Sequence, residues 1–181
     1  MIESEGNSLG KTAVSWKLKV ARLVRHPLLH RLMVWSIRLL VPRHRVGVVV
    51  VILDDRERVL MLRHVFHPFT PWGLPGGWLG HGESPAAGAL RELKEETGLT
   101  AVVESVIHIA HDTDPEHIGI AFLGRAQPGP LTLSAEIVEA DWFALDALPS
   151  PLLTFVQDAI NAAVAARRAI HPDRKSAVAG A

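Results

Sequence analysis

Apolar residues in the middle and last part of the chain follow two patterns, one with the period of a β-strand and one with the period of a helix. Residues 46–53 (VGVVVVIL) form a nearly continuous β-branched run, which is typical of a strand buried on both faces. Residues 58–63 predict a neighbouring strand across a turn at Asp54 and Asp55. Further strands are predicted over residues 101–109, 118–125 and 138–143, and a closing helix over residues 152–169.

Two connecting segments carry polar or aromatic residues without a clear period. Residues 64–71 (HVFHPFTP) contain prolines and aromatic residues, which predicts a loop leading to Trp72. An acidic loop containing Asp112, Asp114 and Glu116 is expected between the strands at 101–109 and 118–125.

The N-terminal part of the chain has a different pattern. Residues 1–11 are polar and contain glycine, which predicts a disordered tail. Apolar residues recur at helical spacing over residues 12–41, and Pro27 either breaks this run into two helices or kinks one. We therefore expect a basic amphipathic helical extension over residues 12–45, one domain over residues 46–170 and a loose tail over residues 171–181.

The charge is zero overall, with 19 Lys and Arg against 19 Asp and Glu, but it is unevenly distributed. Residues 1–46 hold nine Lys and Arg against Glu3 and Glu5, a net of +7, which leaves −7 for the remainder. Three interpretations of the extension stay open. Its apolar face packs on the domain or on a second copy in a homodimer, which is favoured, or residues 12–41 lie on an acidic membrane surface, or they contact nucleic acid. No dedicated nucleic-acid site is evident in the remainder.

The sequence gives some indication of location. The chain contains no cysteine, so a disulfide framework and a thiolate zinc site are excluded, and this fits a reducing cytoplasm. The N-terminus lacks the pattern of a signal peptide, because Glu3 and Glu5 precede any basic residue. The apolar stretch from Leu28 to Val41 is too short to span a bilayer. We expect a cytoplasmic protein.

The clearest helix signal lies between Ser84 and Gly98. Ser84 suits the N-cap, Pro85 the first helical position and Gly98 the left-handed position after the last turn. Ala86, Ala89, Leu90 and Leu93 recur at the spacing of a buried stripe, so one face of this helix should pack on the core.

Beside this stripe the same helix carries three carboxylates. Glu92, Glu95 and Glu96 are spaced so that one sector of the helix surface presents all of them. Because like charges this close repel, a cation is expected among them, and oxygen ligands favour Mg²⁺ or Mn²⁺. Arg91, four residues before Glu95, is placed to hold that carboxylate. The preceding residues 74–82 are rich in glycine, which suits tight turns and close approach of the backbone to a ligand.

These residues fill a fixed pattern. The constrained positions are Gly77, Glu83, Arg91, Glu92, Leu93, Glu95, Glu96, Gly98 and Leu99. In this pattern the chain resembles the Nudix (MutT-like) hydrolase family, with no departures. The resemblance implies an α/β fold, an α/β/α sandwich with a central mixed β-sheet, to which the N-terminal amphipathic helical extension is added. It also implies a hydrolase that cleaves phosphoanhydride bonds with water activated by a divalent metal ion.

The resemblance also suggests a role for each residue. Glu95 and Glu96 look like the principal metal ligands, with the carbonyl oxygen of Gly76 as a further ligand. Glu92 resembles a residue that is the general base in some members and a metal ligand in others, and the choice stays open. Glu83 is similar to a position that binds metal through water or braces the loop. Arg91 would orient Glu95.

Residues outside the motif complete the predicted site. A further carboxylate is expected just before Asp141-Trp142-Phe143, where Glu136 and Glu139 both qualify as metal ligand or base, and Glu136 is favoured. Arg63 is a candidate contact for phosphate. The aromatic candidates for stacking on a base are Phe66, Phe69, Trp72 and Trp78. Histidines 64, 67, 108, 111 and 117 lack the helical pair spacing and third ligand that would predict a zinc site.

The predicted function is therefore a divalent-metal-dependent pyrophosphohydrolase. Its expected substrate is a nucleoside diphosphate linked to another group, such as ADP-ribose, an NDP-sugar or a CDP-alcohol. The alternatives are a pyrophosphohydrolase of nucleoside triphosphates, a nucleotide-sensing module without turnover, and an enzyme recruited to a membrane surface by residues 12–41.

Overall fold

The computed structural model describes residues 26–41, 43–66, 68–113 and 115–170. The chain divides into two compact units, residues 1–43 and 44–181, and each is considered by itself. The predicted tails at 1–11 and 171–181, and the first part of the extension, lie outside the described residues. Among the helices of the described ranges, none has both the length and the apolar run that crossing a bilayer requires.

The described part of the first unit contains one helix, α2 (Pro27–Leu40). Pro27 stands in its first turn, where a missing backbone N–H costs nothing, so this proline begins a helix. The helix ends at Leu40, and the N–H of the next residue, Val41, donates to the carbonyl oxygen of Ile37 at 3.0 Å. Pro27 was predicted either to break the helical run or to kink a single helix. Since α2 begins at Pro27, the structure is compatible with the break.

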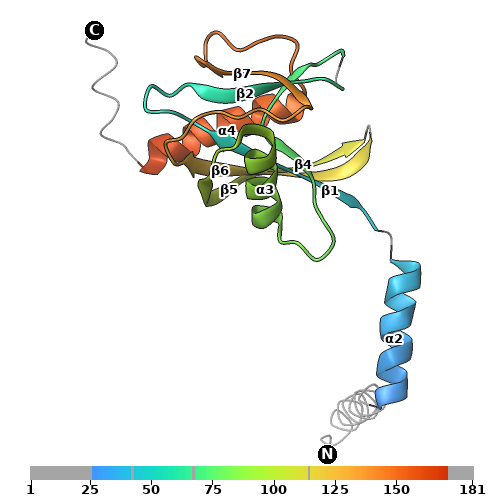
Figure 1. Cartoon of the computed structure of the whole chain (residues 1–181). Helices are drawn as coiled ribbons and strands as arrows, with labels where there is room; N and C mark the ends of the chain where they lie inside the picture. Colours follow the sequence, from blue (N-terminus) through green and yellow to red (C-terminus); the bar gives the residue numbers. More distant parts are fainter. Residues whose placement is uncertain (1–25, 42, 67, 114, 171–181) are drawn as a thin grey trace, which may run out of the picture. The chain divides into compact units, whose positions relative to one another are not determined.

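The second unit is built on two sheets (Figure 1). The four-stranded sheet has the order β4-β1-β6-β5 and the three-stranded sheet the order β3-β2-β7. β1 and β6 pair in parallel, and the other pairs are antiparallel, so the predicted mixed sheet is confirmed. The strands are β1 (Arg45–Ile52), β2 (Val59–His64), β3 (Trp72–Gly73), β4 (Gly76–Trp78), β5 (Ala101–Thr113), β6 (Glu116–Ala126) and β7 (Ile137–Phe143).

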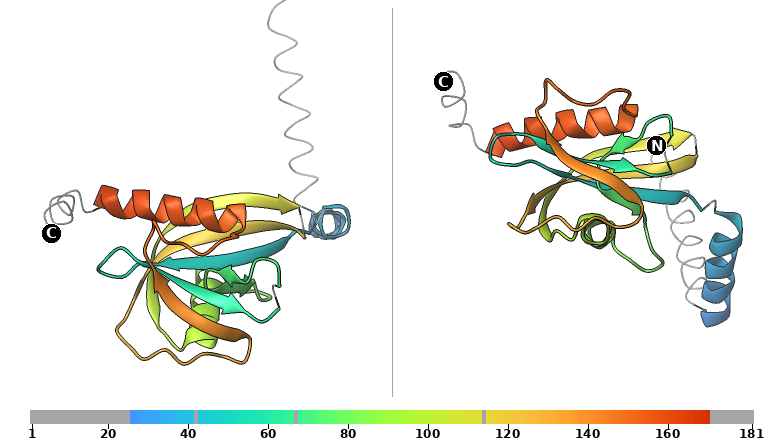
Figure 2. Two further views of the ribbon diagram at one scale, coloured as in Figure 1. Left: turned by 90° about the horizontal axis from the view of Figure 1, so that it is seen from above. Right: turned by 45° about the horizontal axis from the view of Figure 1, so that its top comes forward.

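Two helices cover opposite faces of the four-stranded sheet, as Figure 2 shows. They are α3 (Pro85–Thr97) and α4 (Thr154–Ile170). The core divides along β1, where Val48 and Val50 belong to the cluster that includes α3, while Val51 belongs to the cluster that includes α4. Because alternate residues of a strand point to opposite faces, a continuous apolar run is what a strand between two helical layers needs. The predicted α/β/α sandwich is confirmed.

One loop prediction was wrong in extent. β5 continues to Thr113 and β6 begins at Glu116, with these two residues opposite each other, so Asp112 and Glu116 lie in strands. Pairing with the neighbouring strand stabilises extended backbone even where polar side chains interrupt the apolar pattern. Asp114 lies outside the described residues. This longer hairpin brings its end close to the start of β1, where Arg45 is opposite His117.

Candidate active site on helix α3

Helix α3 is fixed at both ends and along one face. The Ser84 hydroxyl accepts from the Ala87 N–H at 3.3 Å, and Gly98 has a φ of 74°, which a residue with a Cβ adopts only with strain. Ala89 and Leu93 are fully buried. Burying a leucine side chain stabilises by about 1.5–3 kcal/mol. The adjacent face therefore holds its carboxylates on a rigid support.

Arg91 is the hub of that face. Its guanidinium group donates to both carboxylate oxygens of Glu83, at 3.0 and 3.1 Å. It also donates to Glu92 at 2.8 Å and Glu95 at 3.2 Å, and to the Trp78 carbonyl oxygen at 3.2 Å. The sequence indicated only the contact with Glu95. One planar guanidinium group thus holds three carboxylates in fixed positions.

The charges at this hub stabilise one another. The hydrogen bond from Arg91, together with one from the Gly80 N–H at 3.0 Å, lowers the pKa of Glu83. In return the hydrogen bonds to Glu83 and Glu92 raise the pKa of Arg91. Glu83 comes from the loop before α3, eight residues away from Arg91, so helical spacing could not have predicted this pair.

Glu96 is in a different environment, because it is only 7% exposed. One of its oxygens accepts from the Gly76 N–H at 2.9 Å, and the other lies 3.8 Å from Nδ1 of His64. Burial raises the pKa of Glu96 to about 8, and the charges of Glu92, Glu136 and Glu95 act in the same direction. A buried carboxylate among further carboxylates is stabilised by a cation.

The backbone of β4 approaches this cluster closely because two of its residues are glycines. A Cβ on Gly77 would lie 2.5 Å from Cδ of Glu92, which is far inside contact distance. A Cβ on Gly76 would overlap the Val48 carbonyl oxygen on β1. The glycines thus let β4 lie against both β1 and α3. The role of the Gly76 carbonyl as a metal ligand stays a prediction.

The two candidates for an additional acid are in different surroundings. Glu139 on β7 pairs with Arg63 on β2, with 3.2 Å between the guanidinium Nε and the carboxylate. Glu136 acts on Glu96, whose pKa it helps to raise. Glu136 is therefore the candidate whose charge acts on Glu96, while Glu139 forms an ion pair with Arg63.

The aromatic candidates for stacking on a base differ in their burial and in their neighbours. Trp72 is half-buried and packs edge-on against Phe143 with 4.9 Å between ring centroids, so it is part of the core. Phe66 and Phe69 are 72% and 87% exposed. Trp78 is about half exposed and lies edge-on to His117, with 5.1 Å between centroids. Trp78 also lines a cavity.

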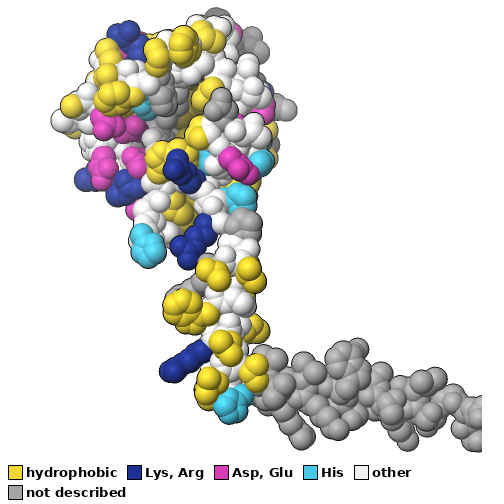
Figure 3. All heavy atoms as spheres, turned by 90° about the vertical axis from the view of Figure 1, so that its right-hand side faces the viewer, with side chains coloured by type: hydrophobic (Ala, Val, Ile, Leu, Met, Phe, Trp, Pro, Cys, Tyr) yellow, Lys and Arg dark blue, Asp and Glu magenta, His cyan; other side chains and the backbone are white. Residues whose placement is uncertain are grey.

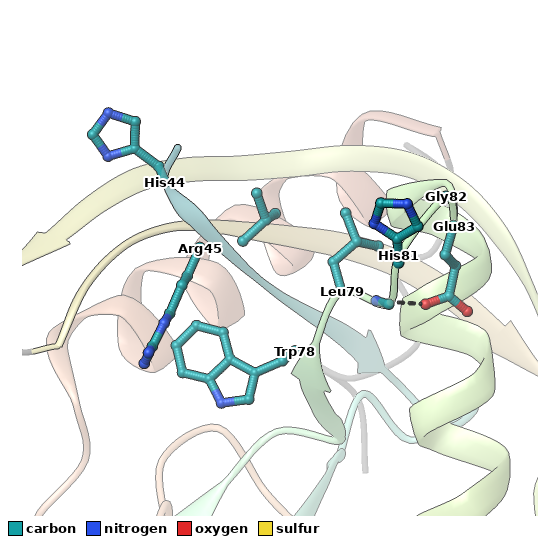
Figure 4. Close-up of a pocket in the computed structure, with 9 residues that line it drawn as sticks. His44, Arg45, Trp78, Leu79, His81, Gly82 and Glu83 are labelled. Atoms are coloured by element: carbon teal, nitrogen blue, oxygen red, sulfur yellow. Dashed lines mark hydrogen bonds between the residues drawn. The ribbon is translucent and has the colours of Figure 1, made fainter. Parts of the chain in front are cut away.

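That cavity has a volume of about 520 Å³ and adjoins Glu83 (Figure 4). This volume falls in the range of pockets that bind small molecules, about 300–1,000 Å³. Its wall combines the indole of Trp78 with the cationic side chain of Arg45. Arg45 and the neighbouring His44 were not singled out from the sequence, because nothing in the local pattern relates the start of β1 to the loop before α3.

The donor set fits a hard divalent cation. Glu83, Glu92, Glu95 and Glu96 offer carboxylate oxygens from one helix and the loop before it, and Glu136 adds negative charge. Mg²⁺ and Mn²⁺ prefer oxygen ligands of this kind. Glu96 is buried and its ionised form is destabilised, so a bound cation would stabilise it. This is the observation that most directly supports a cation at the site.

Comparisons with known proteins show what this chain is similar to. An ADP-ribose pyrophosphatase of Methanocaldococcus jannaschii is 33% identical over 103 residues, which cover 54% of this chain and 61% of that protein. An RNA pyrophosphohydrolase of Agrobacterium fabrum is 33% identical over 108 residues, which cover 46% of this chain and 64% of that protein. The match thus spans less than two thirds of the length of either curated relative.

A crystal structure and a family model extend the comparison. The structure of an ADP-ribose pyrophosphatase from Streptococcus suis has a TM-score of 0.60 at 25% identity, covering 70% of this chain and 93% of that one. The model of the NUDIX domain matches residues 43–164, which is more than half of the chain and includes all the α3 carboxylates. The resemblance found in the sequence is thereby confirmed, and the chain belongs to the NUDIX domain family.

Proposed function

We propose that this protein is a divalent-metal-dependent pyrophosphohydrolase that cleaves a phosphoanhydride bond in a nucleoside diphosphate linked to another group. The observation that carries the proposal is the buried, charge-destabilised Glu96 beside three carboxylates that Arg91 holds together. Membership of the NUDIX domain family supports the same reaction class.

The residues take distinct roles in this proposal. Glu92, Glu95, Glu96 and the carbonyl oxygen of Gly76 hold the cation, and Glu83 and Glu136 supply further negative charge around it. A bound Mg²⁺ or Mn²⁺ would neutralise phosphate charge and lower the pKa of the attacking water. Arg91 is a positioning residue, because it contacts the carboxylates and fixes their rotamers.

The identity of the general base depends on position. Glu92 is held at 2.8 Å by Arg91 and lies against Gly77, so its orientation is fixed on the motif face. Glu136 lies on the segment before β7 and is not among the carboxylates that Arg91 binds. A base must reach the attacking water. Glu92 and Glu136 are the two candidates that the geometry favours, since Glu139 is paired with Arg63.

The cavity beside Glu83 supports a nucleotide-derived substrate. Trp78 offers an aromatic edge and face for a base or ribose, and Arg45 offers a cation for phosphate. Two of the similar proteins are ADP-ribose pyrophosphatases, which favours ADP-ribose or a related nucleoside diphosphate derivative. The similarity to an RNA pyrophosphohydrolase keeps triphosphates as the second candidate class.

The reaction is tested by incubating the protein with ADP-ribose, NDP-sugars and nucleoside triphosphates in the presence of Mg²⁺ or Mn²⁺. In ¹⁸O-labelled water, we expect one of the two phosphate products to gain a single label, since water attacks one phosphorus. Turnover should be abolished by EDTA and restored by Mg²⁺. Absence of cleavage of every diphosphate and triphosphate would contradict the proposal.

We also propose that the N-terminal extension contacts an acidic membrane surface. Helix α2 places Leu28, Leu32, Trp35 and Leu39 along one side at helical spacing, and hydrophobic side chains gather along it in Figure 3. Nine Lys and Arg and no Asp or Glu occur between residues 6 and 53. A helix of this kind lies in the interface of anionic lipids. Charge thus favours lipid over the packing and homodimer interpretations.

Sedimentation with vesicles tests this contact. We expect the protein to sediment with vesicles containing phosphatidylglycerol, to do so less in high salt, and to stay in solution with neutral phosphatidylcholine vesicles. Leu32→Glu should abolish binding, while His30→Glu adds the same charge on the side of the helix opposite Leu32 and should only weaken it. Equal behaviour with both lipids, or a dimer in size-exclusion chromatography that Leu32→Glu dissociates, would reject the lipid surface.

A further inference from the structure

A second group of metal-ligating side chains lies at the end of the four-stranded sheet. It consists of His44, His111 and Glu116, whose ligand atoms all lie within 4.8 Å of one another. Nε2 of His111 is 3.6 Å from the Glu116 carboxylate, and Nδ1 of His44 is 4.0 Å from the same oxygen. The two imidazole rings meet edge-on with 6.3 Å between centroids. These residues are outside the family motif.

Strand pairing explains why they meet. Glu116 begins β6, the strand between β1 and β5. Glu116 is opposite Thr113 on β5. His111 lies two residues before Thr113, so its side chain points to the same side of the sheet as that of Glu116. On the other side of β6, Arg45 is opposite His117, so His44 is level with Glu116. Strands β5 and β6 and the residue just before β1 therefore present one ligand each at the same end of the sheet.

The donors differ in kind from those on α3. Two imidazole nitrogens and one carboxylate oxygen suit Zn²⁺ and similar transition metals, whereas Mg²⁺ prefers oxygen ligands alone. Zinc bonds of about 2.0–2.1 Å in a tetrahedron need ligand atoms roughly 3.3–3.4 Å apart. The two imidazole–carboxylate pairs, at 3.6 and 4.0 Å, are therefore within about 1 Å of this spacing, and the two imidazole nitrogens, which lie within 4.8 Å of each other, need to approach by up to about 1.5 Å. All three residues are exposed, so small rotamer changes close the difference.

We propose that His44, His111 and Glu116 form a binding site for a transition-metal ion of the Zn²⁺ class, with its remaining coordination positions open to water. His44 also lines the cavity that adjoins Glu83, and Figure 4 shows these two residues on opposite sides of it. An ion at this site adds positive charge to the cavity rim next to Arg45. The proposal rests on this geometry and does not depend on the proposed hydrolase activity.

Co²⁺ is a suitable probe because its absorption spectrum reports the number and kind of ligands. The full chain is freed of metal with a chelator and titrated with Co²⁺ in excess Mg²⁺, in the Glu95→Gln/Glu96→Gln background, which weakens the α3 site. We expect one equivalent of Co²⁺ to bind with a spectrum of low coordination number, and Zn²⁺ but not Mg²⁺ to displace it.

Variants assign the site. His111→Ala and Glu116→Gln should each weaken Co²⁺ and Zn²⁺ binding at least about tenfold, since even residues behind metal ligands contribute that much. His81→Ala removes another histidine that lines the cavity but lies outside the group, and should bind as tightly as the parent. Circular dichroism without metal confirms that each variant is folded. No Mg²⁺-resistant Co²⁺ binding, or equal binding by His111→Ala and the parent, would overturn the proposal and leave only surface ion pairs.

Discussion

The α3 carboxylates and the His44 group at the end of the sheet are assembled in opposite ways. On α3, Glu92, Glu95 and Glu96 are within one helical turn and a half, so the helix period alone brings them together. His44 and His111 are distant in sequence, and only strand register makes them neighbours. A site on one helix can therefore be predicted from residue spacing, while a site assembled from several strands can be recognised only in the folded structure.

The two groups also differ in their electrostatics. On α3 a single arginine compensates several carboxylates, and Glu96 is buried. The His44 group is exposed, and there two imidazoles face the carboxylate of Glu116. The buried carboxylate of Glu96 has a large desolvation cost that a hard cation offsets. An exposed imidazole pair carries no such cost and selects its ion by ligand type.

The largest effect is expected on kcat, in a variant that changes the α3 carboxylates and leaves the His44 group intact. Glu96→Gln removes the buried charge of the cluster, and kcat should fall by about 10²–10³-fold or more, because metal-ion stabilisation contributes several kcal/mol. Steady-state kinetics with ADP-ribose and Mg²⁺ measures this. Glu104→Gln is the matched control, since Glu104 pairs with Arg125 on the surface of the same sheet at 3.0 Å and should keep full activity. Similar rates for both variants would show that the α3 carboxylates do not act together in catalysis.

A smaller effect is expected at the hub. Arg91→Lys keeps the charge but loses the planar fork that reaches Glu83, Glu92 and Glu95 at once. Activity should fall about 10–100-fold, and more Mg²⁺ should be needed for half-maximal rate, as is usual for residues that orient metal ligands.

The control for the hub is Arg125→Lys, which alters an exposed pair with Glu104. It should change neither quantity. If Arg91→Lys had an unchanged Mg²⁺ requirement, Arg91 would not position the metal ligands.

A still smaller effect is expected from the backbone beside the cluster. In Gly77→Ala the new methyl group would meet the Glu92 carboxylate at 2.5 Å and displace it. Such overpacking costs about 1–3 kcal/mol, and we expect roughly a tenfold loss of activity. Gly129→Ala adds a methyl group whose nearest neighbour is 3.8 Å away, so it should be neutral. Tm from thermal unfolding and kcat/KM are measured for both variants. Equal values for the two variants would show that a methyl group at position 77 does not displace Glu92.

The smallest effect concerns stability and pH. Burial raises the pKa of Glu96 to about 8 from an ordinary value of 4.5. The contribution of this group to stability is then fully present below pH 4.5 and is lost as pH rises through about 8. In EDTA, Tm should decline over this interval by a few degrees, and Mg²⁺ should reduce the decline because it binds the ionised form.

The same measurement on Glu96→Gln isolates this residue, since the amide does not titrate. Its Tm in EDTA should lose this decline. A wild-type Tm that rises steadily between pH 5 and 8 in EDTA would contradict the assignment.

Much of the fold and of the motif site could be predicted from the sequence. Ser84 and Gly98 mark the ends of α3, and the apolar run at 46–53 corresponds to β1, with its neighbours on both faces. These features depend on contacts close in the chain. The roles assigned to the carboxylates stay predictions, although the geometry brings Glu83, Glu92 and Glu95 to one guanidinium group.

The rest depends on contacts that are distant in the chain. The bond from Arg91 to Glu83 needs the loop before α3 to fold back, and the choice between Glu136 and Glu139 needs the pairing of β2 with β7. Trp72 and Trp78 are equivalent in the sequence, but one packs on Phe143 and the other lines the cavity. Long-range pairing, which local patterns do not encode, decides each of these cases.

We propose that the α3 carboxylates hold the ion on which diphosphate cleavage depends. Crystals grown with Mn²⁺ and examined by anomalous scattering test it most directly. We predict a manganese peak in contact with side chains of Glu92, Glu95 or Glu96, and no such peak in Glu96→Gln crystals. Side chains directed into solvent, with no manganese beside them in the wild-type protein, would contradict the account.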